Sequence, residues 1–326
     1  MEALTSVEQA ERRGEARPAI HLEGLTKRFG HRTAVNGLSI DVPDGVVAGF
    51  VGPNGAGKTT TLRILLGLAR PSSGTGTVLG RAIDDPASYL GRVGGLIEGP
   101  AFHSALSGRR NLEVLAALGG LDPAEIPGLL RQVGLAARAD DAYRTYSLGM
   151  KQRLGIAAAL LGQPELLLLD EPSNGLDPAG IHEMRELIGS LRRADRTVLV
   201  SSHLLTEVEQ VCDWLVMIEQ GHLVYQGPTA DLVASAVTDV AVAPHDPGDF
   251  DALRSLLETN GYAVASAKGR LTVAVDGADA TDVAAEINRS AMHRGIVLAE
   301  LTPVRAGLED RYLSMVGGTD DEGIPS

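Results

Sequence analysis

The sequence predicts an α/β protein with a mainly parallel sheet, followed by a smaller α+β domain. Three observations support this: buried strands alternate with amphipathic helices in the first part of the chain, a glycine-rich loop joins one strand to a helix, and the pattern changes after Pro228. Strands that alternate with helices pair in parallel, because each helix returns the chain to the same edge of the sheet. With 326 residues, 44% of them hydrophobic, the chain can supply a core for both parts.

The first elements expected are two half-buried antiparallel strands. Apolar and polar residues alternate over residues 19–25 and 38–42, which is the pattern of a strand with one buried face. The preceding residues 1–17 are rich in Glu, Arg and Ala and lack the apolar stretch of a signal peptide. We therefore expect a disordered tail over residues 1–17 and a first domain over residues 18–228.

A buried strand, a glycine-rich loop and a helix follow. Residues 46–51 form a nearly all-apolar run, and residues 58–70 carry leucines at helical spacing before Pro71. Two further buried strands are expected at residues 166–170 and 197–201. The helix between them places its apolar residues on one face: Ile181, Met184, Ile188 and Leu191.

The pattern between about residues 91 and 162 is mostly helical, which indicates a helical subdomain inserted into the sheet domain. Residues 229–326 are expected to form the second domain. Its predicted order is strand (239–243), helix (249–259), a hairpin turning at Lys268 and Gly269, helix (279–294), strand (296–302) and a last helix ending near Val316. Each of the first two helices has one apolar face, as a two-layer ferredoxin-like domain requires.

Composition limits the classes of function. The chain has 42 acidic and 29 basic residues and a net charge of −13, which disfavours broad contact with nucleic acid, so no nucleic-acid partner is expected. Cys212 is the single cysteine, which excludes intramolecular disulfides and fits a reducing compartment. The apolar runs are shorter than the 18 or so residues that a membrane span needs, so we do not expect the chain to cross a bilayer.

Residues 52–59 satisfy the phosphate-loop pattern G-x-x-x-x-G-K-[ST]. The pattern needs glycine because the main chain must wrap around phosphate with its N–H groups pointing inward. Lys58 is expected to reach the β and γ phosphates during catalysis, and Thr59 to offer its hydroxyl to Mg²⁺. The expected nucleotide-binding residues here are Gly52, Pro53, Asn54, Gly55, Ala56, Gly57, Lys58, Thr59 and Thr60. By itself, the loop predicts only nucleoside triphosphate binding, because kinases, GTPases, helicases and transporter ATPases share it.

Two acidic residues end the predicted strand 166–170. A carboxylate at a strand end beside the phosphate loop is placed to hold Mg²⁺, which assigns Asp170 to the metal. Its neighbour Glu171 is expected to orient and polarise the attacking water as general base. The sequence therefore predicts hydrolysis of the nucleotide as well as binding.

The segment that begins Tyr146-Ser147-Leu148-Gly149-Met150 opens a helix upstream of Asp170. It resembles the LSGGQ-type signature of ABC ATPases, with Ser147 and Gly149 kept and with Leu148 and Met150 in place of the usual glycine and glutamine. In that family a serine hydroxyl, a glycine N–H and a helix N-terminus close over ATP held by the opposite subunit. The resemblance implies that Ser147 and Gly149 bind ATP in trans.

Other positions match the family one by one. Phe29 stands where an aromatic side chain stacks on adenine, and His203 stands where a histidine contacts the γ phosphate and assists catalysis. Asn174 and Asp177 lie in a loop that resembles the one crossing the dimer interface. The family usually has a Mg²⁺-sensing glutamine where this chain has Glu98, whose oxygen can also reach a metal but adds a negative charge.

The resemblance implies the fold class: a P-loop NTPase of the ABC type, with a parallel sheet core, an antiparallel β subdomain and a helical subdomain, plus the small C-terminal ferredoxin-like domain. It implies ATP and Mg²⁺ as ligands, and a homodimer or a pair with a second ATPase subunit when ATP is bound. It also implies an integral-membrane permease as partner, which would hold the chain at the cytoplasmic face of the membrane.

Within the family, the chain resembles the bacitracin, lantibiotic and multidrug exporter type, so export of a drug or antimicrobial peptide is expected. Transport of lipid or ion cargo remains an alternative, because cargo choice lies largely in the permease. A soluble regulatory or DNA-associated ABC ATPase is an alternative of another class. DNA-repair ATPases of this kind carry a long coiled coil or a zinc insertion, and the sequence shows neither heptads nor cysteine ligands.

Overall fold

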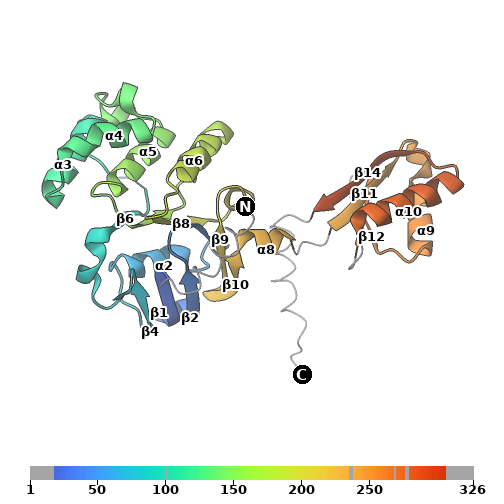
Figure 1. The fold of residues 1–326 in the computed structure, drawn as a ribbon, viewed down its shortest axis with the longest axis horizontal. Helices are drawn as coiled ribbons and strands as arrows, with labels where there is room; N and C mark the ends of the chain where they lie inside the picture. Colours follow the sequence, from blue (N-terminus) through green and yellow to red (C-terminus); the bar gives the residue numbers. More distant parts are fainter. Residues whose placement is uncertain (1–17, 100, 235–237, 268, 276–278, 306–326) are drawn as a thin grey trace, which may run out of the picture. The chain divides into compact units, whose positions relative to one another are not determined.

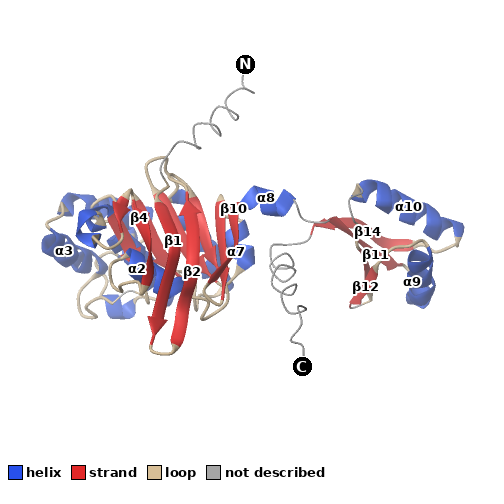
Figure 2. Cartoon of the chain, turned by 90° about the horizontal axis from the view of Figure 1, so that it is seen from below, coloured by secondary structure: helices blue, strands red, loops and turns tan. Residues whose placement is uncertain are grey.

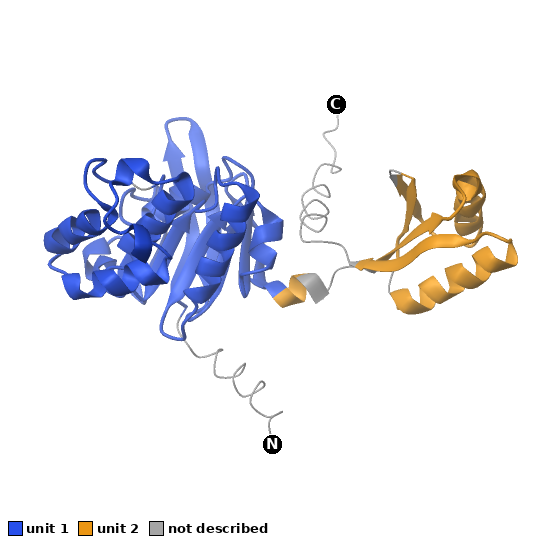
Figure 3. Cartoon of the chain, turned by 90° about the horizontal axis from the view of Figure 1, so that it is seen from above, with its two compact units in different colours: residues 1–229 blue, residues 230–326 orange. Residues whose placement is uncertain are grey.

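The computed structural model describes residues 18–99, 101–234, 238–267, 269–275 and 279–305. The predicted N-terminal tail (1–17), the turn residue Lys268 and the last helix near Val316 lie outside these residues. The chain divides into two units, residues 1–229 and 230–326 (Figure 3). The described helices contain none that is long and apolar enough to span a bilayer.

The first unit contains an antiparallel sheet near its N-terminus. Its strands are β1 (Ile20–Phe29), β2 (Arg32–Val42), β4 (Ser73–Val78) and β5 (Arg81–Ala82), in the order β2-β1-β4-β5 (Figure 2). The predicted antiparallel pair is confirmed, with Ile20 opposite Val42 and Phe29 opposite Arg32. One face of β1 is buried, since Ile20, Leu22 and Leu25 are at most 1% exposed.

The second sheet of this unit has six strands, in the order β10-β9-β3-β8-β7-β6. Figure 1 labels four of them, β6, β8, β9 and β10. The strands are β3 (Val47–Val51), β6 (Val93–Leu96), β7 (Leu166–Asp170), β8 (Thr197–Ser202), β9 (Trp214–Glu219) and β10 (His222–Pro228). All neighbours pair in parallel except β10 and β9, which are antiparallel. Because β3, β7 and β8 are parallel, their carboxyl ends meet at one edge, and this edge carries the candidate site.

Helices complete the first unit: α2 (Lys58–Leu65), α3 (Gly108–Gly119), α4 (Ile126–Gln132), α5 (Leu148–Ala159), α6 (Pro178–Ser190) and α7 (Leu205–Glu209). Figure 1 shows α3, α4 and α5 gathered together, where the helical subdomain is expected. One-turn 3₁₀ segments occur at Pro86–Ser88, Leu90–Arg92, Pro123–Glu125, Ala136–Arg138, Tyr143–Thr145 and, in the second unit, Pro247–Asp249.

Two differences from the sequence expectation have local causes. Helix α2 ends at Leu65 rather than at residue 70, because Gly67 adopts a left-handed conformation (φ 66°) that no helix can continue. The segment from residue 91 does not begin with an α-helix. It contains β6, which pairs with β7 at the edge of the parallel sheet and was hidden in the sequence by Gly94 and Gly95.

The second unit contains the elements β11 (Thr238–Pro244), α9 (Phe250–Thr259), β12 (Val264–Ala267), β13 (Arg270–Val273), α10 (Ala280–His293) and β14 (Leu298–Arg305), after α8 (Thr229–Ala234). Its sheet has the order β12-β13-β11-β14, with every neighbouring pair antiparallel. This is the predicted ferredoxin-like arrangement. Residues of α9 and α10 share one core with the sheet, including Leu253, Leu257 and Ile287 at 0% exposure.

Candidate active site

The phosphate loop joins β3 to α2 at the carboxyl edge of the parallel sheet. Gly57 precedes the helix with φ 108°, a conformation that side chains disfavour. Lys58 begins the helix and is only 5% exposed. Its Nζ donates to the carbonyl oxygens of Gly52 at 2.6 Å and Pro53 at 3.2 Å, so the ammonium group lies within the curve of the loop. A lysine held at a helix N-terminus makes this loop an anion-binding site.

A pocket lies beside the loop. Its lining residues are Phe29, Arg32, Ala34, Asn54, Gly55, Gly57, Lys58, Thr59, Thr60 and Glu171. Phe29 is 51% exposed, and Lys27 places its Nζ 4.9 Å from the centre of the ring. An exposed aromatic ring at the mouth of a phosphate-binding pocket offers a flat apolar surface to a base.

Arg32 is a lining residue that the sequence analysis missed. The antiparallel pairing places it opposite Phe29, and its guanidinium approaches Gly55. A guanidinium group beside a phosphate loop adds a fixed positive charge with several donors. Phe29 ends β1 and Arg32 begins β2, with a two-residue turn between them. A basic residue so close to the predicted adenine-stacking residue is the signal that could have identified Arg32.

Asp170 ends β7 and is 8% exposed. Its Oδ2 accepts a hydrogen bond from the Thr59 hydroxyl at 2.8 Å, and its Oδ1 accepts one from the Ser201 hydroxyl at 2.6 Å. Among the described residues, no three His, Cys, Asp or Glu side chains gather as a metal site. One carboxylate and one hydroxyl nevertheless fit Mg²⁺, which takes few protein oxygens and completes its shell with phosphate oxygens and water.

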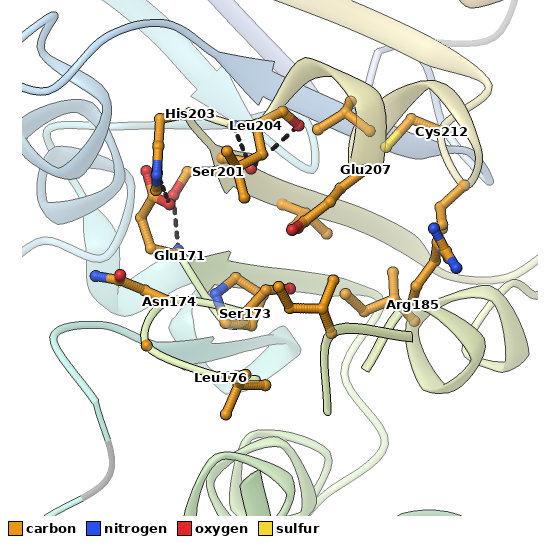
Figure 4. A pocket seen from close by; sticks show the side chains of 18 residues that line it. Glu171, Ser173, Asn174, Leu176, Arg185, Ser201, His203, Leu204, Glu207 and Cys212 are labelled. Carbon is orange, nitrogen blue, oxygen red and sulfur yellow. Dashed lines mark hydrogen bonds and ion pairs between the residues drawn. The ribbon is translucent and has the colours of Figure 1, made fainter. Parts of the chain in front are cut away.

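Glu171 follows in a left-handed conformation (φ 47°), which is strained for a residue with a side chain. Its Oε2 lies 2.8 Å from Nδ1 of His203 (Figure 4). Its Oε1 lies 3.2 Å from Nζ of Lys58. Within the described part of the chain, Oε1 is buried and accepts no hydrogen bond. His203 thus holds one carboxylate oxygen, while the other accepts no hydrogen bond and faces the ammonium group of Lys58.

A second pocket is lined by Glu171 and by residues of α6 and α7, and its lining side chains are drawn in Figure 4. Arg185, Glu207 and Cys212 are among its lining residues. Burial raises the pKa of the Glu207 carboxyl, and a hydrogen bond from Ser173 opposes this shift. Burial also raises the pKa of the Cys212 thiol to about 12. The thiol is therefore unreactive at neutral pH.

The signature segment lies apart from this pocket in the same chain. Ser147 caps α5, since its Oγ accepts a hydrogen bond from the N–H of Met150 at 3.3 Å. Ser147 is exposed and Gly149 half-buried. Leu148, 45% exposed, packs against Gly175. None of the residues that line the phosphate-loop pocket comes from α5, and the assignment of Ser147 and Gly149 to ATP remains a prediction.

The remaining predicted residues have structural partners. Asp177 caps α6 by accepting a hydrogen bond from the N–H of Gly180 at 3.2 Å. Asn174 is exposed and its N–H donates to the carbonyl of Glu171 at 3.0 Å. Glu98 forms an ion pair with Arg63, is 62% exposed and does not line the phosphate-loop pocket. Its assignment to the metal remains a prediction.

Comparison with known proteins extends these observations. The family described as ABC transporter matches residues 35–174, and the family described as Domain of unknown function (DUF8746) matches residues 238–309. The bacitracin transport ATP-binding protein BcrA of Enterococcus faecalis is 37% identical over 302 residues, which cover 92% of this chain and 96% of the relative. The lantibiotic transport ATP-binding protein SrtF of Streptococcus pyogenes is 40% identical over 207 residues, which cover 64% of this chain and 90% of the relative.

Solved structures agree with the fold. An ATP-binding subunit of an ABC transporter is 29% identical, with a TM-score of 0.59, and the match covers 66% of this chain and 92% of that chain. The cbiO1 protein of Clostridium perfringens, part of the ABC transporter complex cbiONQ, has a TM-score of 0.60 at 23% identity, covering 74% of this chain and 95% of that chain. The predicted family and fold class are confirmed. The chain belongs to the ABC transporter family, as an ATP-binding subunit that hydrolyses ATP.

Proposed function

We propose that hydrolysis takes place between the phosphate loop and Glu171, and that it powers a separate membrane permease that exports a drug or antimicrobial peptide. Lys58 binds the β and γ phosphates of ATP, while Thr59 and Asp170 provide the oxygens for Mg²⁺. When bound, Mg²⁺ neutralises charge on the phosphate oxygens. Phe29 stacks on the adenine ring and so fixes the opposite end of the nucleotide.

The position of Oε1 of Glu171 is the observation that carries the catalytic assignment: among the described residues it is buried without a hydrogen bond, 3.2 Å from Nζ of Lys58. As the water oxygen attacks the γ phosphorus, this oxygen accepts the water proton, and the bond from the γ phosphorus to the β–γ bridging oxygen breaks to release ADP and phosphate. His203 holds the other oxygen, Oε2, at 2.8 Å. The carboxylate therefore presents a fixed face to the water.

The signature residues support an ATP-bound dimer. Because the N-terminus of α5 does not line the pocket of its own chain, Ser147 and Gly149 would bind the γ phosphate held by a second subunit. Asn174 and Asp177, on the exposed loop that leads into α6, would lie at the same interface. The second subunit is either another copy or a related ATPase.

The export proposal rests on relatives rather than on the site. The Enterococcus faecalis relative named for bacitracin transport aligns over 96% of its length, so the match extends into the second unit as well as the ATPase unit. The lantibiotic transport relative points to the same class of cargo. An integral-membrane permease would receive the motion of the helical subdomain and hold the chain at the cytoplasmic face of the membrane.

The catalytic part is tested by measuring ATPase activity of Glu171→Gln. We expect kcat to fall by about 100-fold or more, because general-base catalysis contributes that much. Glu165→Gln is the matched control. Glu165 directly precedes the opposite end of β7, where its carboxylate pairs with Arg92 at 2.5 Å, so its variant should keep native activity. Native hydrolysis by Glu171→Gln would show that the base is another residue.

The transport part needs a cellular assay. The chain would be purified from its source membranes with the integral-membrane protein that co-isolates, and the pair expressed in a bacitracin-sensitive bacterium. We expect resistance to bacitracin or a lantibiotic to rise with the native pair and to be lost with Glu171→Gln. Co-isolation of nucleic acid without any membrane protein would contradict the transporter role.

A further inference from the structure

Ser201 connects the two acidic residues of the site, and no motif assigns it a role. It pairs with Asp170 across β8 and β7 and is 0% exposed. Its Oγ lies 2.6 Å from Oδ1 of Asp170 and 2.9 Å from the backbone nitrogen of Glu171. Figure 4 shows Ser201 beside Glu171 and His203.

The direction of these hydrogen bonds follows from the groups involved. A carboxylate can only accept, so the Ser201 hydroxyl donates to Asp170. The N–H of Glu171 can only donate, so it donates to the hydroxyl oxygen, and it also lies 3.2 Å from the carbonyl of Ser201. The hydroxyl therefore uses its single proton and one lone pair to join a carboxylate to a main-chain N–H. The contact with Asp170 is buried and the contact with Glu171 is partly buried, and hydrogen bonds are stronger in such surroundings than in water.

We propose that Ser201 is a positioning residue for ATP hydrolysis. By holding Oδ1 of Asp170, it turns Oδ2 towards the Thr59 hydroxyl, 2.8 Å away, with which it would hold Mg²⁺. By accepting from the N–H of Glu171, it stabilises the strained φ of 47° from which the side chain reaches His203. One hydroxyl thus sets the metal ligand and the catalytic base relative to each other.

The same strand provides a matched control. Thr197, at the other end of β8, is also 0% exposed. Its hydroxyl donates to Oδ1 of Asp44 at 2.9 Å and accepts from the N–H of Gly45 at 2.9 Å. Ser201→Ala and Thr197→Val therefore each remove one hydrogen bond to an aspartate and one from a main-chain N–H, from two positions on one strand. Both should lower the melting temperature, but only Ser201 joins the acidic pair of the site.

The test measures metal affinity as well as turnover. Mn²⁺ binding is titrated by electron paramagnetic resonance in the presence of a non-hydrolysable ATP analogue. For Ser201→Ala we expect Mn²⁺ affinity to fall about 10-fold and kcat to fall about 10-fold or more, since residues that orient a metal ligand typically contribute this much. KM for ATP should stay within about 2-fold, because Ser201 is not expected to touch the nucleotide. Thr197→Val should keep native Mn²⁺ affinity and kcat.

Native Mn²⁺ affinity and kcat in Ser201→Ala would overturn the proposal, as would the same losses in Thr197→Val. Ser201→Thr keeps the hydroxyl and serves as the second variant, and it should retain Mn²⁺ affinity. A folded Ser201→Thr protein with the affinity of Ser201→Ala would contradict the role of the hydroxyl. The proposal rests on the assignment of Asp170 to the metal, so Asp170→Asn is titrated alongside. If that variant binds Mn²⁺ normally, the metal site itself is misassigned.

Discussion

Replacing Gly57 with alanine tests how closely the main chain must approach at the phosphate loop. A Cβ at this position would lie 2.5 Å from the carbonyl oxygen of Ala34. Ordinary van der Waals contact begins at 3.4 Å, so this distance is 0.9 Å too short (3.4 − 2.5). Because the clashing oxygen belongs to the main chain, the rotation of a side chain cannot relieve the clash. The φ of 108° adds backbone strain for alanine.

The expected effect follows from the displacement. Because a misplacement of about 1 Å at a catalytic site can lower the rate by about 100-fold, we expect kcat/KM for ATP to fall by that order in Gly57→Ala. The assay is steady-state release of phosphate from ATP, with thermal melting of the same preparation.

Gly37→Ala is the control for backbone strain without the close approach. Gly37 also has a positive φ, 64°, but a Cβ there would meet nothing within 4 Å. This variant should lose about 1 to 2 kcal/mol of stability and keep native turnover. If Gly57→Ala hydrolyses ATP at the native rate, or if Gly37→Ala loses activity equally, the close approach to Ala34 does not control the loop.

Three further predictions concern single side chains. Phe29→Ala should raise KM for ATP roughly 3- to 10-fold while Phe29→Tyr keeps it, and an unchanged KM in Phe29→Ala would place adenine elsewhere. Glu98→Gln should leave the melting temperature unchanged, because its ion pair with Arg63 is exposed, but should raise the Mg²⁺ concentration for half-maximal ATPase activity. No change in that concentration would remove Glu98 from the metal site. Cys212, 8% exposed, should resist iodoacetamide at pH 8.5 until urea unfolds the protein, and rapid labelling of the folded chain would contradict its burial and raised pKa.

The parts of the molecule that sequence predicted well are those with local signals. The strand before the phosphate loop is a continuous apolar run, and all five residues of β3 are buried. The phosphate loop has a fixed spacing, and Asp177 is a regular N-cap before α6. Such features depend on residues that are close together in the sequence, so the local pattern of residue types is enough to predict them.

The parts that sequence did not predict depend on distant contacts. Strand β6 is short and half glycine, and it forms because β7 lies beside it. Strand β9 pairs with β3 and β10 pairs with β9, and neither strand carries a motif. Ser201 acquires its contacts only when β8 pairs with β7, which joins residues about 30 positions apart in the chain. No periodicity or motif in the sequence indicates such residue pairs, because they come together only when the strands pair in the sheet.

The left-handed backbone at Glu171 lowers the stability of the folded protein at the same position that ATP hydrolysis requires to be glutamate. Asparagine adopts φ near 47° more easily than glutamate does, so Glu171→Asn relieves strain while it removes the base, whereas Glu171→Gln keeps the strain. Selection for heat resistance alone would therefore favour loss of the catalytic carboxylate. Glutamate persists there only under simultaneous selection for ATP hydrolysis, and a thermostabilised library screened without that requirement should accumulate inactive variants at residue 171.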